Sequence, residues 1–369
     1  MLFDDYERTD SRPLLPRESL YALYNRSASE EIAASRSLIE RWFRNFPDEC
    51  EREELKAKFQ SGESEHFYSV IFELYLASQM LERGFHLEIH PVLPNDNGRR
   101  PDFLVTDQNG EQFYIEASVV MNASGLPTNR QIEDFLLELD QRPHPNFMIG
   151  ISYEGEPAVP PSAVQAANHI HRWLDNLDFE VCEKTLRTAP ESLPRTEWED
   201  RGLTIKVEAL PIRQNQEDIR ENRLIGMGSI QGGVLDRKTS LIRKLGKKSK
   251  RYGELDKPFI IAVQTIDLPG RIEDDNVDAL YGTSTMRAWD SSVYRANDGF
   301  WQLREQQLSK RGVSGVWIVD RLNLHALESV QSMRYLCPEP THPVPNSLLH
   351  YRHAVLNEDQ VEYHGEDFI

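Results

Sequence analysis

Three acidic residues within one short stretch of the chain could together hold a divalent cation. Glu73 falls in a helical pattern, Asp102 follows Pro101 at the start of a strand pattern, and Glu116 lies in the next strand pattern. Directly paired residues of a hairpin approach within about 5.5 Å, so Asp102 and Glu116 can chelate one ion. Carboxylates and water are the ligands that Mg²⁺ prefers. The three acids are a candidate site for Mg²⁺, with Mn²⁺ as the alternative ion.

The elements that must position these acids can be read from the hydrophobic pattern. Apolar residues recur at helical spacing over residues 67–81, and Gly84 ends that helix. Strand-like runs follow at 85–89, 101–105 and 112–120, with Asn109-Gly110 favouring a tight hairpin between the last two. A helix over 132–139 and a buried strand over 147–153 complete an α-β-β-β-α-β order.

These residues and this order resemble the PD-(D/E)xK superfamily of restriction-endonuclease-like nucleases. The resemblance rests on residues 72–75 (FELY), 100–103 (RPDF) and 114–118 (YIEAS). It implies an α/β fold with a restriction-endonuclease-like core, a mixed sheet flanked by helices. An N-terminal helical extension and a C-terminal α/β extension would surround that core. We expect borders at residues 1–60, 61–195 and 196–369.

The same resemblance implies roles for individual residues. Glu73, Asp102 and Glu116 would hold Mg²⁺, and a lysine two positions after the strand acid would stabilise the transition state. In this chain that position is Ser118. A serine hydroxyl carries no positive charge, and losing a comparable electrostatic donor costs about 10²–10³ in rate. The resemblance therefore leaves open whether catalysis survives.

Three sources could replace the missing positive charge, and the sequence does not choose between them. Between Lys58 and Lys184 the chain contains no lysine. Arg100 precedes Asp102, and Arg130 begins the following helix pattern. A basic helix is expected over residues 236–252. Its basic residues are Arg237, Lys238, Arg243, Lys244, Lys247, Lys248, Lys250 and Arg251.

The charge balance bears on a nucleic-acid partner. The formal net charge of −18 opposes binding to phosphate backbones through overall electrostatics, so a DNA or RNA partner needs a local basic patch. The basic helix is the densest such region. We expect nucleic-acid contacts from Arg243, Lys244, Lys247, Lys248 and Arg251, although a solvated helix face is the ordinary role of such residues.

The composition also limits the cellular setting. Three cysteines without CxxC spacing favour neither a disulfide framework nor a zinc finger, and a reducing compartment fits them. The acidic first residues do not resemble a signal peptide, and no apolar run approaches the roughly 20 residues of a membrane helix. We expect a cytoplasmic protein with no membrane partner.

The leading hypothesis is a metal-dependent nuclease that hydrolyses DNA, or RNA as the less favoured substrate, in prokaryotic restriction or phage defence by family analogy. The alternative is a catalytically inactive pseudo-nuclease that binds nucleic acid or protein. A hydrolase of a small phosphorylated substrate is a third reading. A second copy of the chain or an operon-encoded protein is a further candidate partner.

Each acid also has a simpler explanation. Glu73 could be a solvated residue of an amphipathic helix, and Asp102 could cap a turn. Glu116 stands among apolar residues, where a buried carboxylate without a partner would be costly, so a metal or a cationic group must face it. His86, Glu88 and His90 share one strand face and could bind a transition metal, but an exposed polar face is the ordinary reading.

Overall fold

The computed structural model describes the whole chain except residues 13, 15–17, 96–97, 122–129, 156, 158, 213–223, 232–236, 267–271, 287–292, 321, 325–329 and 367–369. The chain divides into two compact units. The larger unit combines Met1–Met121 with Asp236–Ile369, and the smaller unit is Asn122–Leu235. The smaller unit is thus an insertion, and the division does not follow the borders expected at residues 60 and 195.

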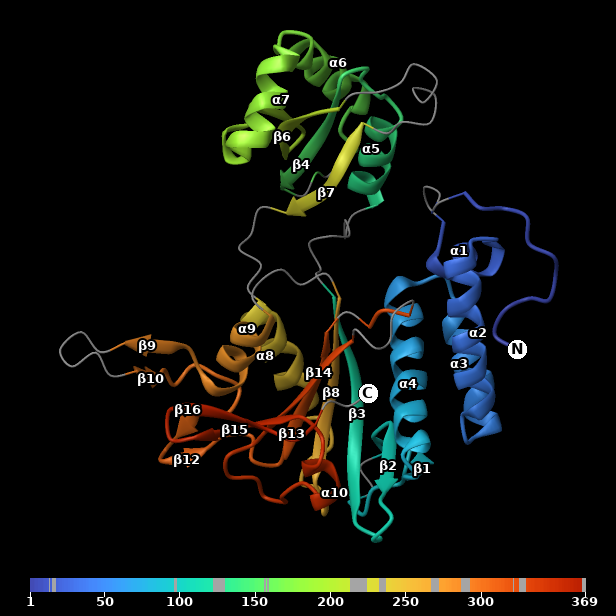
Figure 1. The fold of residues 1–369 in the computed structure, drawn as a ribbon, viewed down its shortest axis with the longest axis vertical. Coiled ribbons are helices and arrows are strands. Elements are labelled where there is room, and N and C mark those ends of the chain that lie inside the picture. Colours follow the sequence, from blue (N-terminus) through green and yellow to red (C-terminus); the bar gives the residue numbers. More distant parts are fainter. Residues whose placement is uncertain are drawn as a thin grey trace. The chain divides into compact units, whose positions relative to one another are not determined.

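An eight-stranded mixed sheet forms the centre of the larger unit (Figure 1), with strand order β1-β2-β3-β8-β13-β14-β15-β16. β1, β2 and β3 form an antiparallel meander, as the sequence predicts, and β3, β8 and β13 are parallel. The strands are β1 (His86–Ile89), β2 (Phe103–Thr106), β3 (Gln112–Met121), β8 (Phe259–Ile266), β13 (Gly315–Asp320), β14 (Gln331–Leu336), β15 (His353–Asn357) and β16 (Gln360–His364).

The β2–β3 turn shows why this hairpin forms where the sequence predicts it. The Asp107 carboxylate accepts hydrogen bonds from the amides of Asn109 and Glu111, both at 2.8 Å. Gly110 adopts a φ of 83°, which residues with a side chain rarely reach. The turn is therefore fixed by local chemistry alone.

Helices cover both faces of the sheet (Figure 1). One face packs against α4 (Ser64–Glu82), with α2 (Glu30–Asn45) and α3 (Glu49–Phe59) behind it. The other packs against α8 (Arg237–Lys248) and α9 (Ile272–Tyr281). The described helices of the larger unit also include α1 (Leu20–Arg26) and α10 (Asn346–Leu349), and its short strands are β9 (Ser284–Met286), β10 (Val293–Arg295), β11 (Leu303–Arg304) and β12 (Gln307–Leu308).

The expected N-terminal helical extension contains three helices, α1, α2 and α3. The break between α2 and α3 comes at Asp48, whose side chain accepts hydrogen bonds from the amides of Cys50 and Glu51 and so caps α3. The long helix expected over residues 67–81 is confirmed as α4, and it is apolar almost all round because it lies between the sheet and the other helices. Within the described part of the chain, no helix has the length and apolar character needed to cross a membrane.

The smaller unit has its own four-stranded sheet, in the order β5-β6-β4-β7, and its own apolar core. Its elements are α5 (Arg130–Asp140), β4 (Phe147–Glu154), α6 (Ala163–Leu174), α7 (Phe179–Thr188), the 3-10 turn η1 (Pro190–Ser192), β5 (Arg195–Asp200), β6 (Leu203–Pro211) and β7 (Ile225–Gln231).

One strand assignment from the sequence is wrong. The segment over residues 147–153 was expected to complete the sheet of the acidic residues, but it is β4 and pairs with β6 and β7 in the smaller unit. β8 lies beside β3 instead. The expected order is therefore present only when the insertion is set aside, as α4-β1-β2-β3-α8-β8. The basic helix accordingly packs on the main sheet and does not belong to a separate C-terminal extension.

Candidate functional site

Asp102 lies at the point where β2 begins to pair with β3. The last pair of this antiparallel register is Phe103 with Ile115, so Asp102 and Glu116 lie one residue beyond it on either strand. The Asp102 carboxylate instead accepts a hydrogen bond from the Ala117 amide at 2.6 Å. Its other oxygen lies 3.8 Å from Nε2 of His90. Asp102 is thus held against β3 through its side chain.

Glu116 is completely buried in β3 and has three polar partners. Its Oε1 lies 2.5 Å from the Lys248 ammonium and 3.0 Å from the Arg251 guanidinium, and its Oε2 accepts a hydrogen bond from the Tyr252 hydroxyl. All three partners come from the end of α8 and the residues just after it. The cationic partner that the sequence demanded for this buried acid is therefore present.

Glu73 approaches from α4, on the opposite side of the sheet from α8. Its Oε1 lies 2.7 Å from the ammonium of Lys58, which belongs to α3, and accepts a hydrogen bond from Ser69 at 3.0 Å. Lys58 also donates to the Ser69 hydroxyl at 3.0 Å. Glu73 is therefore not the solvated helix residue of the simpler explanation.

The three carboxylates influence one another electrostatically. Burial raises the pKa of Asp102 well above its usual range, and the negative charges of Glu116 and Glu73 raise it further. The Ala117 amide and the Lys248 charge act in the opposite direction. Asp102 therefore lies within electrostatic reach of both other acids.

In this structure the positive charges at the site come from lysine and arginine side chains of the protein. Among the described residues, no group of three or more His, Cys, Asp or Glu side chains has the geometry of a metal site. Two of the three carboxylates hold a lysine, and Glu73 and Glu116 come from opposite faces of the sheet. The donor set is nevertheless the hard oxygen set that Mg²⁺ prefers, so a metal would have to take the place of the lysines.

The position of the missing lysine is occupied by a buried serine. The Ser118 hydroxyl makes no hydrogen bond with the part of the chain that the structure describes. Of the three proposed substitutes, the basic helix reaches the acids, through Lys248 and Arg251. Arg100 is exposed and contributes its backbone carbonyl, which accepts from the Tyr252 hydroxyl at 3.1 Å. The Arg130 side chain lies outside the described residues.

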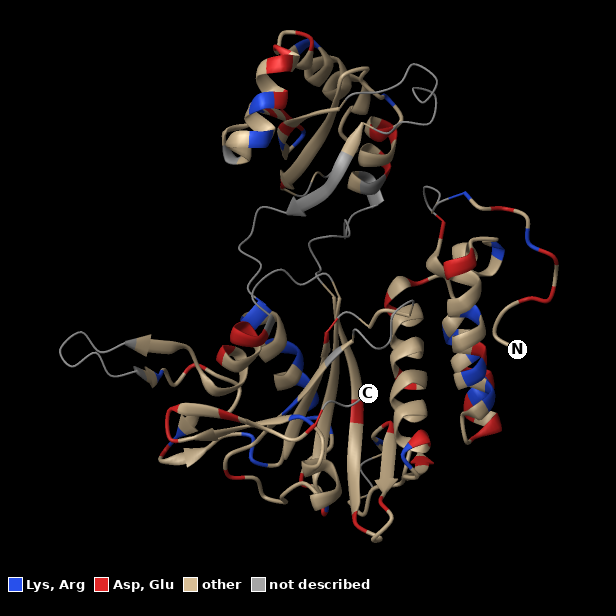
Figure 2. Cartoon of the chain, in the orientation of Figure 1, with Lys and Arg blue, Asp and Glu red and all other residues tan. Residues whose placement is uncertain are grey.

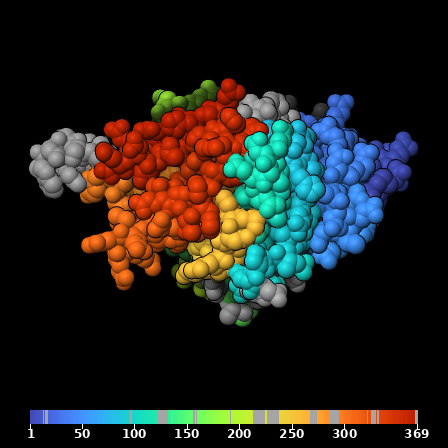
Figure 3. All heavy atoms as spheres, turned by 90° about the horizontal axis from the view of Figure 1, so that it is seen from below, coloured from blue at the N-terminus to red at the C-terminus, as the bar shows by residue number. Residues whose placement is uncertain are grey.

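The basic residues in the second half of α8 and just after it fall into two stripes, about 100° apart around the helix axis. Lys244, Lys248 and Arg251 face acids, with Lys244 3.4 Å from Glu65. Arg243 and Lys247 are exposed and form no ion pair within the described chain. Figure 2 shows the basic residues gathered along α8, and Figure 3 shows the chain around residue 250 at the surface beside the β1–β3 region.

Three further residues of the site were not identified from the sequence. Lys58 and Tyr252 carried no local motif, and they lie 15 and 136 residues from the acids they contact. His90 was considered as a ligand of a separate metal, yet its ring lies 3.0 Å from Glu51 and near Asp102. The only sequence signal for His90 was its place, with His86 and Glu88, on one polar face of β1, and this did not predict its contacts with Glu51 and Asp102.

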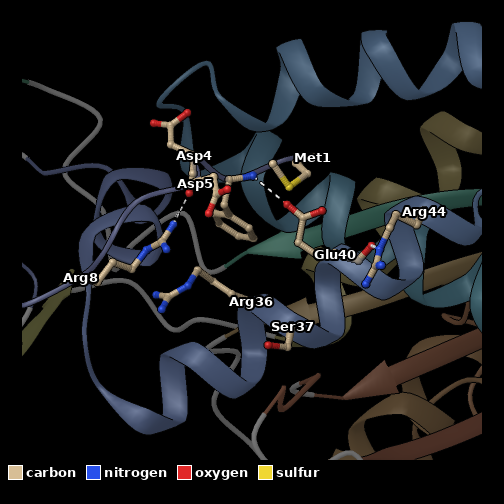
Figure 4. Close-up of a pocket in the computed structure, with 9 residues that line it drawn as sticks. Met1, Asp4, Asp5, Arg8, Arg36, Ser37, Glu40 and Arg44 are labelled. Atoms are coloured by element: carbon tan, nitrogen blue, oxygen red, sulfur yellow. Dashed lines mark hydrogen bonds between the residues drawn. The ribbon is translucent and has the colours of Figure 1, made fainter.

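A cavity of about 350 Å³ elsewhere in the larger unit does not include these acids (Figure 4). The amides of Leu2 and Phe3 donate to Glu40, and Arg8 donates to the backbone carbonyl of Asp4. Acidic and basic side chains are balanced around it, and several of its polar groups already have partners within the chain. We assign no chemistry to this cavity.

Comparison with known proteins adds no relative to this description. No family model, no curated protein and no solved structure matches the chain.

Proposed function

We propose that this protein is a metal-dependent nuclease that hydrolyses phosphodiester bonds of DNA. The observation that carries the proposal is the ion pair of Lys248 with the buried strand acid Glu116, within electrostatic reach of Asp102, which also feels the charge of Glu73. The element order α4-β1-β2-β3-α8-β8 also supports a restriction-endonuclease-like core, once the insertion is set aside.

In this proposal Asp102 and Glu116 would hold Mg²⁺ and Glu73 would complete the set from α4. When bound, the ion would polarise the phosphate and lower the pKa of a water molecule. Binding would draw a proton from Asp102, because its raised pKa favours the neutral form without a cation. The acids would then release Lys58 and Lys248 from their present ion pairs.

Lys248 would take the role of the lysine that Ser118 replaces. Its side chain is 18% exposed, and its ammonium pairs with Glu116, the strand acid that the family lysine normally follows by two positions. Once released from Glu116, it would place a positive charge beside the phosphate, where negative charge develops. Tyr252 would stay protonated, because burial and the Glu116 charge raise its pKa, and it would keep donating to Glu116 or to the Arg100 carbonyl.

The exposed stripe of α8 would contact the DNA backbone. Arg243 and Lys247 point away from the acids that neutralise Lys244 and Lys248. Such lysines and arginines bind phosphates without regard to sequence, with an affinity that falls as salt rises.

The test is cleavage of plasmid and single-stranded DNA with Mg²⁺ or Mn²⁺ by the full chain and two isosteric variants, Asp102→Asn and Glu116→Gln. Both variants should lose cleavage, while Glu88→Gln, at an exposed acid of β1, should cleave like the parent protein. Equal activity in all four proteins would mean that another nuclease contaminates the preparation and would remove the support for the proposal.

The ion pairs themselves favour a second candidate, a nucleic-acid-binding pseudo-nuclease. Glu73 and Glu116 are already neutralised by lysines, as they would be in a scaffold that no longer binds metal. Calorimetric titration with Mn²⁺ separates the two candidates. Binding that disappears in Asp102→Asn supports the nuclease, whereas DNA binding with no metal uptake and no cleavage supports the scaffold.

A further inference from the structure

A second cavity in the larger unit, of about 200 Å³, lies between α1, α4 and β8. Residues 322–324, which follow β13, close one side of it. We call it the α1–α4 pocket. Aromatic side chains line it, among them Tyr24, Phe67 and Tyr68, together with Leu322 and the amide side chain of Gln264. It is smaller than the roughly 300 Å³ at which pockets for drug-sized ligands begin, so it would fit one small ring system.

Gln264 is the unusual residue of this pocket. It is 2% exposed in a strand whose other residues are all apolar or small, and it faces α4 together with Ala262 and Ile266. Its Oε1 has no hydrogen-bond partner among the described residues. An unpaired buried carbonyl oxygen is destabilising, so a ligand that donates to it would relieve this cost.

The aromatic rings and the Gln264 amide together are the kinds of group that bind a nucleobase. Phe67 packs edge-on against Tyr24 and against Tyr68, with ring centroids 5.1 Å and 5.8 Å apart. Unpaired nucleobases bind proteins by packing against aromatic rings and by hydrogen bonds along their edges. A glutamine amide offers a donor and an acceptor side by side, which matches the edge of a base.

The position of the pocket relative to the three acids also fits a nucleic acid. Tyr68 precedes Glu73 by five residues on α4, which is about 7.5 Å along a helix. Gln264 pairs with Val119, three residues beyond Glu116 on β3 and so about 10 Å along the strand. Because α4 runs antiparallel to β3 (Figure 1), both distances lead in the same direction.

We propose that the α1–α4 pocket binds a single unpaired nucleobase, whose edge pairs with the Gln264 amide. This inference rests on the proposed function, because the base would belong to the strand whose phosphate lies at the acids. It makes single-stranded or locally opened DNA the substrate class of that site. A free nucleoside has the same chemistry and is the other source of such a base.

The experiment measures binding of fluorescently labelled single strands to the full chain in EDTA, so that no cleavage is needed. One strand is oligothymidine and the other is the same backbone without bases. The parent protein should bind the strand with bases about tenfold more tightly. Gln264→Leu should remove this difference and keep the affinity for the base-free strand. Gln307→Leu, at an exposed glutamine of β12, should retain the difference.

Circular dichroism checks that Gln264→Leu folds, which we expect because it removes an unpaired polar atom from the interior. Equal affinity of the parent protein for both strands would overturn the inference, as would a difference that survives in Gln264→Leu. Thymidine that competes as well as oligothymidine would point to a free nucleoside as the occupant and overturn the strand assignment. Base-dependent binding without cleavage would support the nucleobase pocket and overturn the proposed nuclease function. Cleavage without base-dependent binding would support the nuclease function and overturn the nucleobase pocket.

Discussion

Helix α8 carries a buried ion pair at each end, and the two pairs differ in their surroundings. At its first residue, Arg237 pairs with Asp320, and both also bond to Asn276 and Thr265. At its last residue, Lys248 pairs with Glu116, beside two further carboxylates. The first pair is enclosed by neutral partners, whereas the second lies among further charged groups, Arg251, Asp102 and Glu73.

This difference indicates which pair is structural and which can be exchanged. The side chains of Arg237 and Asp320 are 2% and 6% exposed, so separating them would leave an uncompensated charge in the interior. Lys248 and Arg251 are 18% and 46% exposed, and either can move toward solvent or toward a phosphate. We therefore expect the first pair to hold α8 on the sheet and the second to respond to ligands.

The largest expected effect is on stability, at the enclosed pair. Asp320→Ala should lower the free energy of unfolding by about 3–5 kcal/mol, because it leaves the Arg237 guanidinium buried without a counter-charge. Urea unfolding followed by circular dichroism measures this loss. Asp298→Ala, which breaks the half-exposed pair with Lys238 on the same helix, should cost at most about 1 kcal/mol. Similar losses in both variants would erase the distinction between enclosed and exposed pairs.

The next effect is on catalysis, at the exchangeable pair. Lys248→Ala should reduce single-turnover DNA cleavage by about 10²–10³, the loss typical of one electrostatic donor. Its stability should change little, since Arg251 and Tyr252 remain on Glu116. Lys248→Arg should restore part of the rate. Lys250→Ala, at an exposed lysine nearby, should not slow cleavage. If it slows cleavage as much as Lys248→Ala does, the effect is not specific to the pair of Lys248 with Glu116.

A smaller effect is expected in the pH dependence of stability without metal. The pKa of Asp102 is raised in the folded state. The contribution of this carboxyl group to the free energy of unfolding is therefore fully present below about pH 3.9, its pKa in the unfolded chain, and is lost as pH rises through its folded-state pKa. Asp102→Asn should therefore melt a few degrees above the parent protein at pH 8 and equally at pH 3.5.

Asp107, at the turn of the same hairpin, provides the opposite control. Burial acts to raise the pKa of Asp107, but its hydrogen bonds, including those from the Glu111 and Asn109 amides, lower it overall. The contribution of Asp107 to the free energy of unfolding is therefore present above its unfolded-state pKa and is lost as pH falls through its folded-state pKa. Asp107→Asn should therefore melt below the parent protein at pH 8. The same sign for both variants would contradict the electrostatic account of Asp102.

The smallest effect concerns the exposed stripe of α8. Replacing both Arg243 and Lys247 by alanine should weaken DNA binding about equally for all sequences and lower the slope of log affinity against log salt by about 2. Fluorescence anisotropy at several salt concentrations gives the slope. An unchanged slope would show that DNA does not touch this stripe.

The sequence predicted the part of the site that local patterns determine. The turn at Asp107 to Gly110 fixes the β2–β3 hairpin, and that hairpin brings Asp102 toward Glu116. The helical period of α4 carries Glu73 within electrostatic reach of Asp102. These features depend on neighbours within a few residues, which is why their spacing alone revealed them.

The strand order of the main sheet and the remaining residues of the site depend on contacts between segments far apart in the sequence, which no local pattern encodes. β4 and β8 are both runs of eight mostly buried residues, so either could have been the strand beside β3. The wrong choice hid the insertion and placed the basic helix outside the core. Lys58 and Tyr252 entered the site through packing of α3 and of the turn after α8, which only the assembled fold shows.

The insertion between β3 and α8 has a consequence for how the chain is made. Glu116 leaves the ribosome 132 residues before Lys248, which corresponds to roughly 7 to 26 seconds of synthesis. During that time the acidic hairpin lacks its main counter-charge, and β3 lacks its parallel neighbour. We therefore expect the nascent chain to keep its first half unfinished while the smaller unit folds, and to complete the central sheet only after residue 266 has emerged.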